Sequence, residues 1–225
     1  MFPSQLAGYN RGIIQSGREI YLMLGMHLRL DDYFGRLKSE LDRVSRADVE
    51  RLAQELYEAW EAGRFVFVFG NGGSAATASH FAADWGKNSV PARELTALGG
   101  KRLKILSLTD NVAWLSALGN DLGYDQIFVQ QLVHYASPGD LAIAISGSGN
   151  SPNVLAAVEW ANRHGLVSFG LTGYDGGKLK RIQQAGIHVA LDDMAMVESI
   201  HACIGHWIVD DLTARIGRTG RYAGA

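Results

Sequence analysis

The sequence predicts an α/β protein of the flavodoxin-like type, a doubly wound three-layer sandwich around a five-stranded parallel sheet, preceded by N-terminal helices. Three observations lead to this class. Five short, mostly apolar runs recur along the chain, and helical patterns separate them. These runs do not alternate between apolar and polar residues, as in strands that are buried on both faces. The 225 residues, 47% of them hydrophobic, are enough to bury such a core.

Two helices are expected ahead of the first strand. Apolar residues from Phe34 to Val44 recur at the spacing of one helix face. The next helix, in "SRADVERLAQELYEAWEAG", opens with Ser45 and Asp48 in a capping-box arrangement. We treat residues 1–30, which are rich in glycine, as an extension without a predicted structure, and residues 31–225 as one domain.

The predicted strands follow Gly63 and alternate with helices. In chain order they are "RFVFVFG" (64–70), "LKILSLT" (103–109), "DLAIAIS" (140–146), "LVSFGLT" (166–172) and "IHVALD" (187–192). Such an order implies right-handed crossovers and a parallel sheet that is covered on both faces. Ligands of these sheets bind at the carboxyl ends of the strands.

Composition narrows the classes of function. A net charge of -2 with scattered Lys and Arg argues against a nucleic-acid surface and favours small ligands or protein partners. The single cysteine, Cys203, excludes an intrachain disulfide, predicts a reducing cytoplasm, and lies in an apolar stretch that indicates a buried position. No apolar run reaches membrane-spanning length, and none has the pattern of a signal peptide.

Two of the predicted strand ends carry similar loops. "FGNGGSAATASHFAADW" (69–85) and "ISGSGNSPNVLAAV" (145–158) each join a strand to a helix through glycines, hydroxyls and amides. A helix N-terminus with such residues favours an anion, and phosphate is the expected one. Neither loop has the spacing of a dinucleotide-binding motif, and the Walker A lysine is absent.

His80 and Asp84 stand four residues apart on the helix after the first loop. This spacing puts both side chains on one helix face. From the residues alone, a surface hydrogen bond and a ligand role both remain open.

Four segments in order give the chain a resemblance to a known family. "GNGGSAATASHFAADW", "LTDNVAWLSALGNDLGYDQIF", "ISGSGNSPNV" and "LTGYDGGKL" resemble the landmarks of sugar isomerase (SIS) domain proteins, and most closely the phosphoheptose isomerase branch. The resemblance covers roughly residues 31–212. It implies an isomerase of sedoheptulose 7-phosphate that forms a homotetramer with active sites at protomer boundaries.

The resemblance also implies roles for the loop residues. The phosphate-binding hydroxyls match Ser146, Ser148 and Ser151, with Gly147 where the family often has Thr. Residues that match the sugar-binding positions follow the first two strands: Asn71, Gly72, Gly73, Ser74 and Asp110. Asp110 also suits a helix cap.

Isomerases of this branch bind zinc, and the matching positions here are His80, Asp84, Glu198 and His206. Two of them depart from the family pattern, because Asp84 replaces Glu and Glu198 replaces Gln. Eight helical residues rise about 12 Å, so a straight helix hardly brings Glu198 and His206 to one ion. Either the helix end is distorted or the centre combines residues from neighbouring protomers. His201 is a nearer neighbour of Glu198, and we expect it to make a helix–helix contact instead.

The chemistry implied is the transfer of protons between adjacent carbons and their oxygens through an enediol, with Asp84 as base and His206 as acid. Two alternatives remain. A catalytically silent SIS protein would bind a phosphosugar or a replication initiator without turnover. An isomerase of a shorter ketose phosphate would keep the chemistry and change the length of the pocket.

Overall fold

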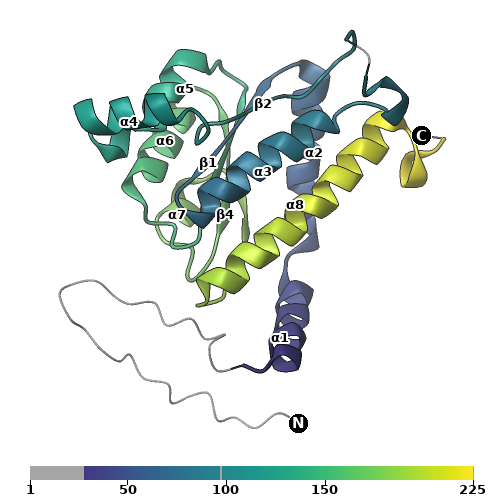
Figure 1. Cartoon of the computed structure of the whole chain (residues 1–225), viewed down its shortest axis with the longest axis horizontal. Coiled ribbons are helices and arrows are strands. Elements are labelled where there is room, and N and C mark those ends of the chain that lie inside the picture. The colour runs from purple at the N-terminus through teal and green to yellow at the C-terminus, as the bar shows by residue number, and fades with distance from the viewer. Residues whose placement is uncertain (1–27, 97, 225) are drawn as a thin grey trace.

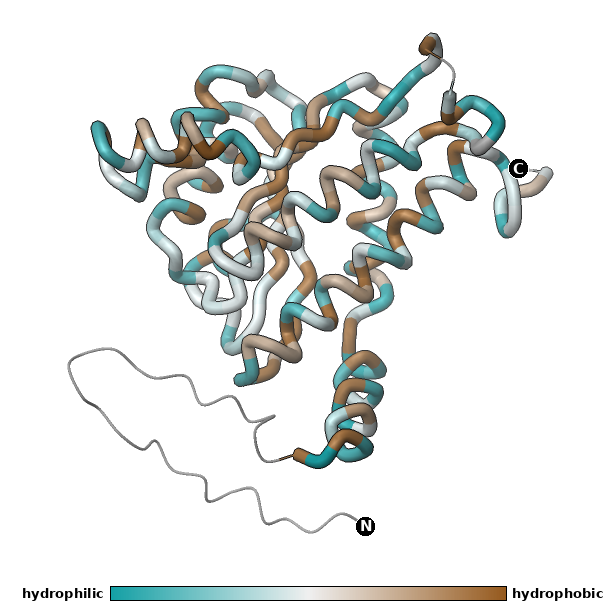
Figure 2. The backbone as a smooth tube through the Cα atoms, viewed as in Figure 1, coloured by the Kyte–Doolittle hydropathy of each residue, from teal (hydrophilic) through white to brown (hydrophobic). Residues whose placement is uncertain are grey.

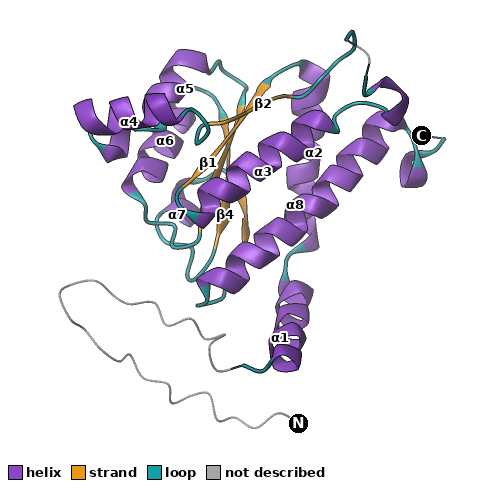
Figure 3. Ribbon diagram, in the orientation of Figure 1, coloured by secondary structure: helices purple, strands orange, loops and turns teal. Residues whose placement is uncertain are grey.

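A parallel five-stranded sheet lies at the centre of the computed structural model, which describes residues 28–96 and 98–224 (Figure 3). The sheet has the strand order β2-β1-β3-β4-β5. Its strands are β1 (Phe65–Gly70), β2 (Lys104–Ser107), β3 (Leu141–Ser146), β4 (Val167–Thr172) and β5 (Ala185–His188). The α/β prediction is therefore confirmed. Within the described residues, no helix is long and apolar enough to cross a bilayer.

The fifth strand is displaced from its predicted place at 187–192. It begins at Ala185 and ends at His188, which pairs with Thr172, the last residue of β4. Val189 still donates to the Thr172 carbonyl, at 2.9 Å, but the chain then turns toward the last helix. The length of β4 sets this boundary, and apolarity alone does not reveal it.

Helices cover both faces of the sheet (Figure 1). One layer contains α2 (Arg46–Ala62), α3 (Gly73–Lys87) and α8 (Met194–Gly217), which share a core with one side of the strands. The other contains α4 (Val112–Asp121), α5 (Val129–Tyr135), α6 (Pro152–Arg163) and α7 (Leu179–Ile182). The strands are largely hydrophobic along the tube in Figure 2, as expected for a sheet buried between two layers.

The first helix, α1 (Leu30–Arg43), projects from the body of the molecule (Figure 1). None of its residues is buried, and Leu30 and Phe34 are 67% and 56% exposed. Arg36 ties it to Asp193, just before α8, through an ion pair of 3.0 Å. Residues 1–27 of the predicted extension lie outside the described residues.

Of two local predictions on helices, one is confirmed and the other is wrong. The Ser45 hydroxyl accepts a hydrogen bond from the Asp48 amide, as the capping pattern predicts. The prediction that Cys203 is buried is wrong, because its side chain is exposed. Ile200 and Ile204 take the core side of α8, which leaves Cys203 on the outer side beside Trp207.

Candidate functional site

The two glycine-rich loops meet at the carboxyl edge of the sheet, because β1 and β3 are neighbours. Gly70 pairs with Ile145 at the last step of their register. A Cβ on Gly70 would lie 2.6 Å from the Ile145 carbonyl oxygen, so this position requires glycine. The close approach of the two backbones places both loops at one site.

The loop after β3 offers hydroxyls at the start of α6. Ser146 Oγ accepts from the Gly149 amide at 3.2 Å, and Ser148 Oγ accepts from the Asn150 amide at 3.3 Å. These bonds leave both hydroxyl hydrogens able to donate. Ser151 is the N-cap residue of α6 but makes no capping hydrogen bond with its side chain. Three hydroxyls at the positive end of a helix suit a phosphate.

The segment that begins "LTGYDGG" holds this loop in place. The amides of Gly173 and Leu179 donate to the carbonyls of Gly147 and Gly149, at 2.8 and 2.9 Å. Gly149 has a φ of +63°, and a Cβ there would collide with the Gly176 carbonyl. Only glycine allows both the backbone angle and the contact.

Gly147 stands where the resembled family often has Thr, and Met194 fills the space that such a side chain would need. A Cβ on Gly147 would collide with the sulfur of Met194, the first residue of α8. The ring of Tyr174 lies 4.0 Å from the same point. A thioether therefore borders the loop after β3 at the position where the resembled family often has a hydroxyl.

The loop after β1 leads directly into α3. Ser74 is buried, and Gly72 adopts a φ of +56° as the N-cap residue. The carboxylate of Glu198 lies against Gly73, at the N-terminus of α3. Burial raises the pKa of Glu198 above its ordinary value.

Asp110 follows β2 and joins a hydroxyl network. Its Oδ1 accepts from Ser79 Oγ and from Thr109 Oγ1, the latter at 3.4 Å. It does not cap the following helix with its side chain. Asn111 does so, accepting from the Trp114 amide at 3.1 Å. The cap therefore lies one residue later than the pattern suggests, and the exposed Asp110 side chain contacts α3 through Ser79.

His80, Asp84 and His206 form one cluster, in which the ligand atoms all lie within 4.8 Å of one another. His80 Nε2 is 3.0 Å from Asp84 Oδ2 and 3.3 Å from His206 Nε2. His206 Nε2 is 4.0 Å from Asp84 Oδ2. Two imidazoles and a carboxylate are a donor set that first-row divalent ions accept.

The crossing of α3 and α8 brings this cluster together. A Cβ on Gly205 would collide with the ring of Phe81, so the two helices approach closely there. Trp85 Nε1 donates to the Gly205 carbonyl at 3.0 Å. His80 and His206 are 126 residues apart in the sequence, and the packing of these helices brings them together.

Two residues of α8 lie away from the cluster. Glu198 is at Gly73 and not with His206, as the helical rise suggests, so its role as a metal ligand stays a prediction. His201 is buried near the Thr172 backbone and His188, at the ends of β4 and β5. Burial lowers the pKa of His201 to about 4.

Two further side chains that reach the loops were not expected from the sequence. Asn153, in the first turn of α6, is buried and hydrogen-bonded to Asn71. Tyr124, on the 3-10 helix Tyr124–Gln126, donates from its hydroxyl to Asn71 Oδ1 at 3.1 Å. A polar residue directly after the Ser-Pro pair was a signal for Asn153, whereas nothing in the pattern singles out Tyr124.

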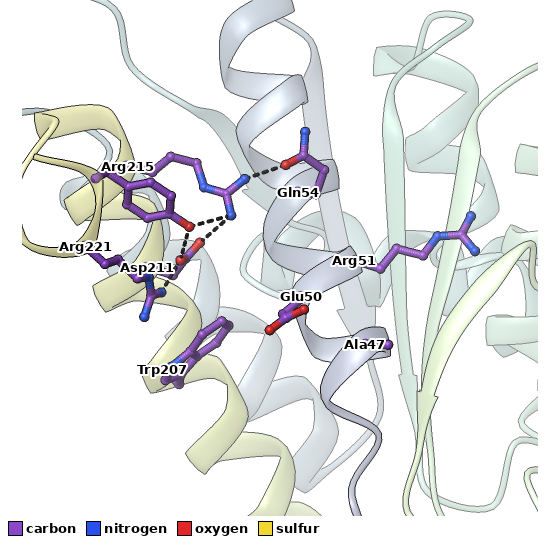
Figure 4. Close-up of a pocket in the computed structure, with 9 residues that line it drawn as sticks. Ala47, Glu50, Arg51, Gln54, Trp207, Asp211, Arg215 and Arg221 are labelled. Carbon is purple, nitrogen blue, oxygen red and sulfur yellow. Dashed lines mark hydrogen bonds and ion pairs between the residues drawn. The ribbon is translucent and has the colours of Figure 1, made fainter. Parts of the chain in front are cut away.

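A separate cavity of about 550 Å³ lies between α2 and the C-terminal half of α8 (Figure 4). Three of its charged side chains are paired with one another, because the buried Asp211 forms ion pairs with Arg215, at 3.1 Å, and with Arg221. Gln54 accepts a hydrogen bond from Arg215 on the opposite wall. These side chains attach the C-terminal segment to the helices, and none of them belongs to the loops at the strand ends.

The fold and the paired loops define a SIS domain protein. Residues 32–173 match the SIS domain family, and the chain belongs to that family. It is 36% identical over 198 residues to a phosphoheptose isomerase of Trichlorobacter lovleyi, a match that covers 88% of this chain and 93% of the relative. A phosphoheptose isomerase of Paramagnetospirillum magneticum is 38% identical over 75% of this chain and 84% of its own length.

A solved structure supports the same relationship. The phosphoheptose isomerase of Neisseria gonorrhoeae superimposes with a TM-score of 0.73 at 29% identity, covering 83% of this chain and 97% of that one. Sequence and structure therefore agree on an isomerase branch of the family.

Proposed function

We propose that the protein is a phosphoheptose isomerase that interconverts sedoheptulose 7-phosphate and D-glycero-D-manno-heptose 7-phosphate through an enediol. The observation that carries this proposal is the pairing of a hydroxyl-rich loop at a helix N-terminus with a cluster of two imidazoles and a carboxylate. The first group of residues suits the phosphate and the second suits proton transfer. The named relatives support the same reaction.

In the proposed reaction, the phosphate does not react but positions the sugar. Its binding to Ser146, Ser148 and Ser151 lowers the entropic cost of bringing the sugar carbons to the cluster. Asp84 takes a proton from C1 of the ketose, and the resulting enediol receives a proton at C2. His206, which lies beside Asp84, moves the proton between the two sugar oxygens.

A divalent ion, zinc above all, is part of the proposal. The donor set of His80, Asp84 and His206 fits such an ion, because each residue offers a ligand atom within 4.8 Å of the others. When bound, the ion polarises the sugar carbonyl and stabilises the negative charge of the enediol. Glu198 lies at Gly73, away from this cluster, so as the predicted fourth ligand it would come from a neighbouring protomer.

Incubation of the purified protein with sedoheptulose 7-phosphate, with and without added zinc, tests the activity directly. NMR should show a new aldose phosphate. If no ketose phosphate of five to seven carbons is converted in the presence of divalent ions, a phosphosugar-binding protein without turnover replaces the isomerase.

The phosphate loop yields a binding prediction. Replacing Ser146 and Ser151 together with Ala should weaken the binding of the sugar phosphate by about 1.5–3 kcal/mol for each hydrogen bond lost, because the acceptor is charged. Isothermal titration calorimetry measures this loss. Ser116→Ala, on the exposed side of α4, is the matched control and should bind as the wild type does. An unchanged affinity in the double variant would remove the phosphate from this loop.

We also propose a homotetramer with sites at the protomer boundaries, as the resemblance implies. The support here is α1, whose apolar Leu30 and Phe34 are exposed on a helix without any buried residue. Light scattering at micromolar concentration should give four times the chain mass of 24.4 kDa. Phe34→Asp should reduce the assembled mass, since a charge would be buried in the contact. A monomeric mass for the wild type would contradict the proposal.

A further inference from the structure

The two loops of the site are joined by a pair of amide side chains. Asn71 Nδ2 donates to Asn153 Oδ1 at 2.9 Å, and Asn153 Nδ2 donates to Asn71 Oδ1 at 2.8 Å. Each amide is thus both donor and acceptor toward the other. Two parallel hydrogen bonds fix distance and orientation more strictly than one bond does.

The pair is shielded and further anchored on both sides. Asn153 is 1% exposed, and its Oδ1 also accepts from the Val154 amide at 2.9 Å. The Tyr124 hydroxyl donates to Asn71 Oδ1 at 3.1 Å. A buried amide without hydrogen-bond partners costs free energy. Removing one amide of the pair would leave the other unsatisfied.

The amide pair connects the loop after β1 with the first turn of α6. Asn71 follows β1 and begins the loop that leads into α3, the helix of His80 and Asp84. Asn153 lies two residues after Ser151, in the first turn of the helix behind the phosphate loop. The hydrogen-bonded amides therefore set how far the phosphate loop stands from the helix that carries the reacting groups.

We propose that Asn153 is a positioning residue of the isomerisation, which through its amide pair with Asn71 sets the spacing between the phosphate loop and the groups that transfer the protons. The inference rests on the proposed function. A sugar phosphate spans both parts of the site, so an error of about 1 Å in their spacing can cost about a hundredfold in rate. Inorganic phosphate reaches only one part and is insensitive to that spacing.

Asn153→Asp is the sharpest test, because the two side chains have nearly the same shape. A carboxylate at position 153 still accepts from Asn71 Nδ2, but it presents an oxygen without a proton to Asn71 Oδ1. A protonated carboxyl donates there and restores the pair. Burial disfavours the ionised form, which shifts the restored state toward neutral pH.

The expected result is a ratio of variant to wild-type kcat/KM that depends on pH. The ratio should be near one at low pH and fall about 10- to 100-fold as the carboxyl ionises, mainly through kcat. The affinity for inorganic phosphate should stay within about twofold of the wild type throughout, since the phosphate loop is intact. Asn71→Asp should give the same pH dependence, because the pair is reciprocal, and it serves if Asn153→Asp does not fold.

Asn162→Asp provides the matched control. Asn162 lies on α6 as well, but near its opposite end, where it hydrogen-bonds Ile182 and Ser168. Its ratio to the wild type should not vary with pH. A pH-independent ratio for Asn153→Asp, or a parallel loss of inorganic phosphate binding, would overturn the positioning role. A wild type that converts no ketose phosphate would instead overturn the proposed function.

Discussion

Asp84→Asn is expected to abolish the exchange of the C1 proton of sedoheptulose 7-phosphate with solvent deuterium. The amide keeps the shape of the side chain but cannot accept a proton at catalytic pH, so the enediol does not form. Binding of the sugar phosphate should change little, because the hydroxyls of the phosphate loop are untouched. The effect is the largest that we expect from a single substitution, a loss of essentially all turnover.

NMR in deuterium oxide measures this exchange, and the zinc content of the variant is determined alongside it. Asp121→Asn, at the exposed end of α4, is the control and should exchange as the wild type does. Exchange at the wild-type rate in Asp84→Asn would exclude Asp84 as the base. Lost exchange in a variant that still binds zinc would separate the base from a purely metal-binding role.

The second large effect is a loss of stability in acid that originates at His201. Burial lowers the pKa of this side chain to about 4 in the folded protein, from an ordinary value of 6.5. Between these two values the unfolded chain binds the proton and the folded chain does not, so stability falls as the pH drops from 6.5 to 4. The full shift corresponds to a loss on the order of 3 kcal/mol.

Urea unfolding at a series of pH values between 4 and 7 measures this loss. His201→Gln should flatten the pH dependence, whereas His164→Gln, on the exposed end of α6, should leave it as in the wild type. NMR of the wild-type imidazole gives an independent reading. Titration of His201 with an ordinary midpoint near 6.5 would contradict the prediction.

The fold was predictable because the strands are buried on both faces. Runs such as residues 65–70 and 141–145 are apolar, and this pattern indicates a parallel sheet without any knowledge of pairing. The end of β5 was not predictable in the same way. Val189 and Leu191 are as apolar as the strand itself, and only the length of β4 decides where pairing stops.

Part of the candidate site was predictable from local sequence spacing, and part of it depends on tertiary packing. His80 and Asp84 are four residues apart, so one helix suffices to bring them together, and the spacing predicts it. His206 joins them only through the crossing of α3 and α8, which sequence spacing cannot predict. Only the family resemblance suggested that His206 belongs to the site. Asn153 and Met194 act through contacts with distant loops, and no local pattern contains such contacts.

Met194, Glu198 and His206 all belong to α8, a single helix of 24 residues. Met194 lies at the loop after β3, Glu198 at the start of α3, and His206 at the cluster with His80 and Asp84. Because an unbroken helix moves as a rod, any slide or tilt of α8 displaces all three contacts together. The two ends of the candidate site are thus joined by one helix, and a partner that binds α8 at either end would act on both.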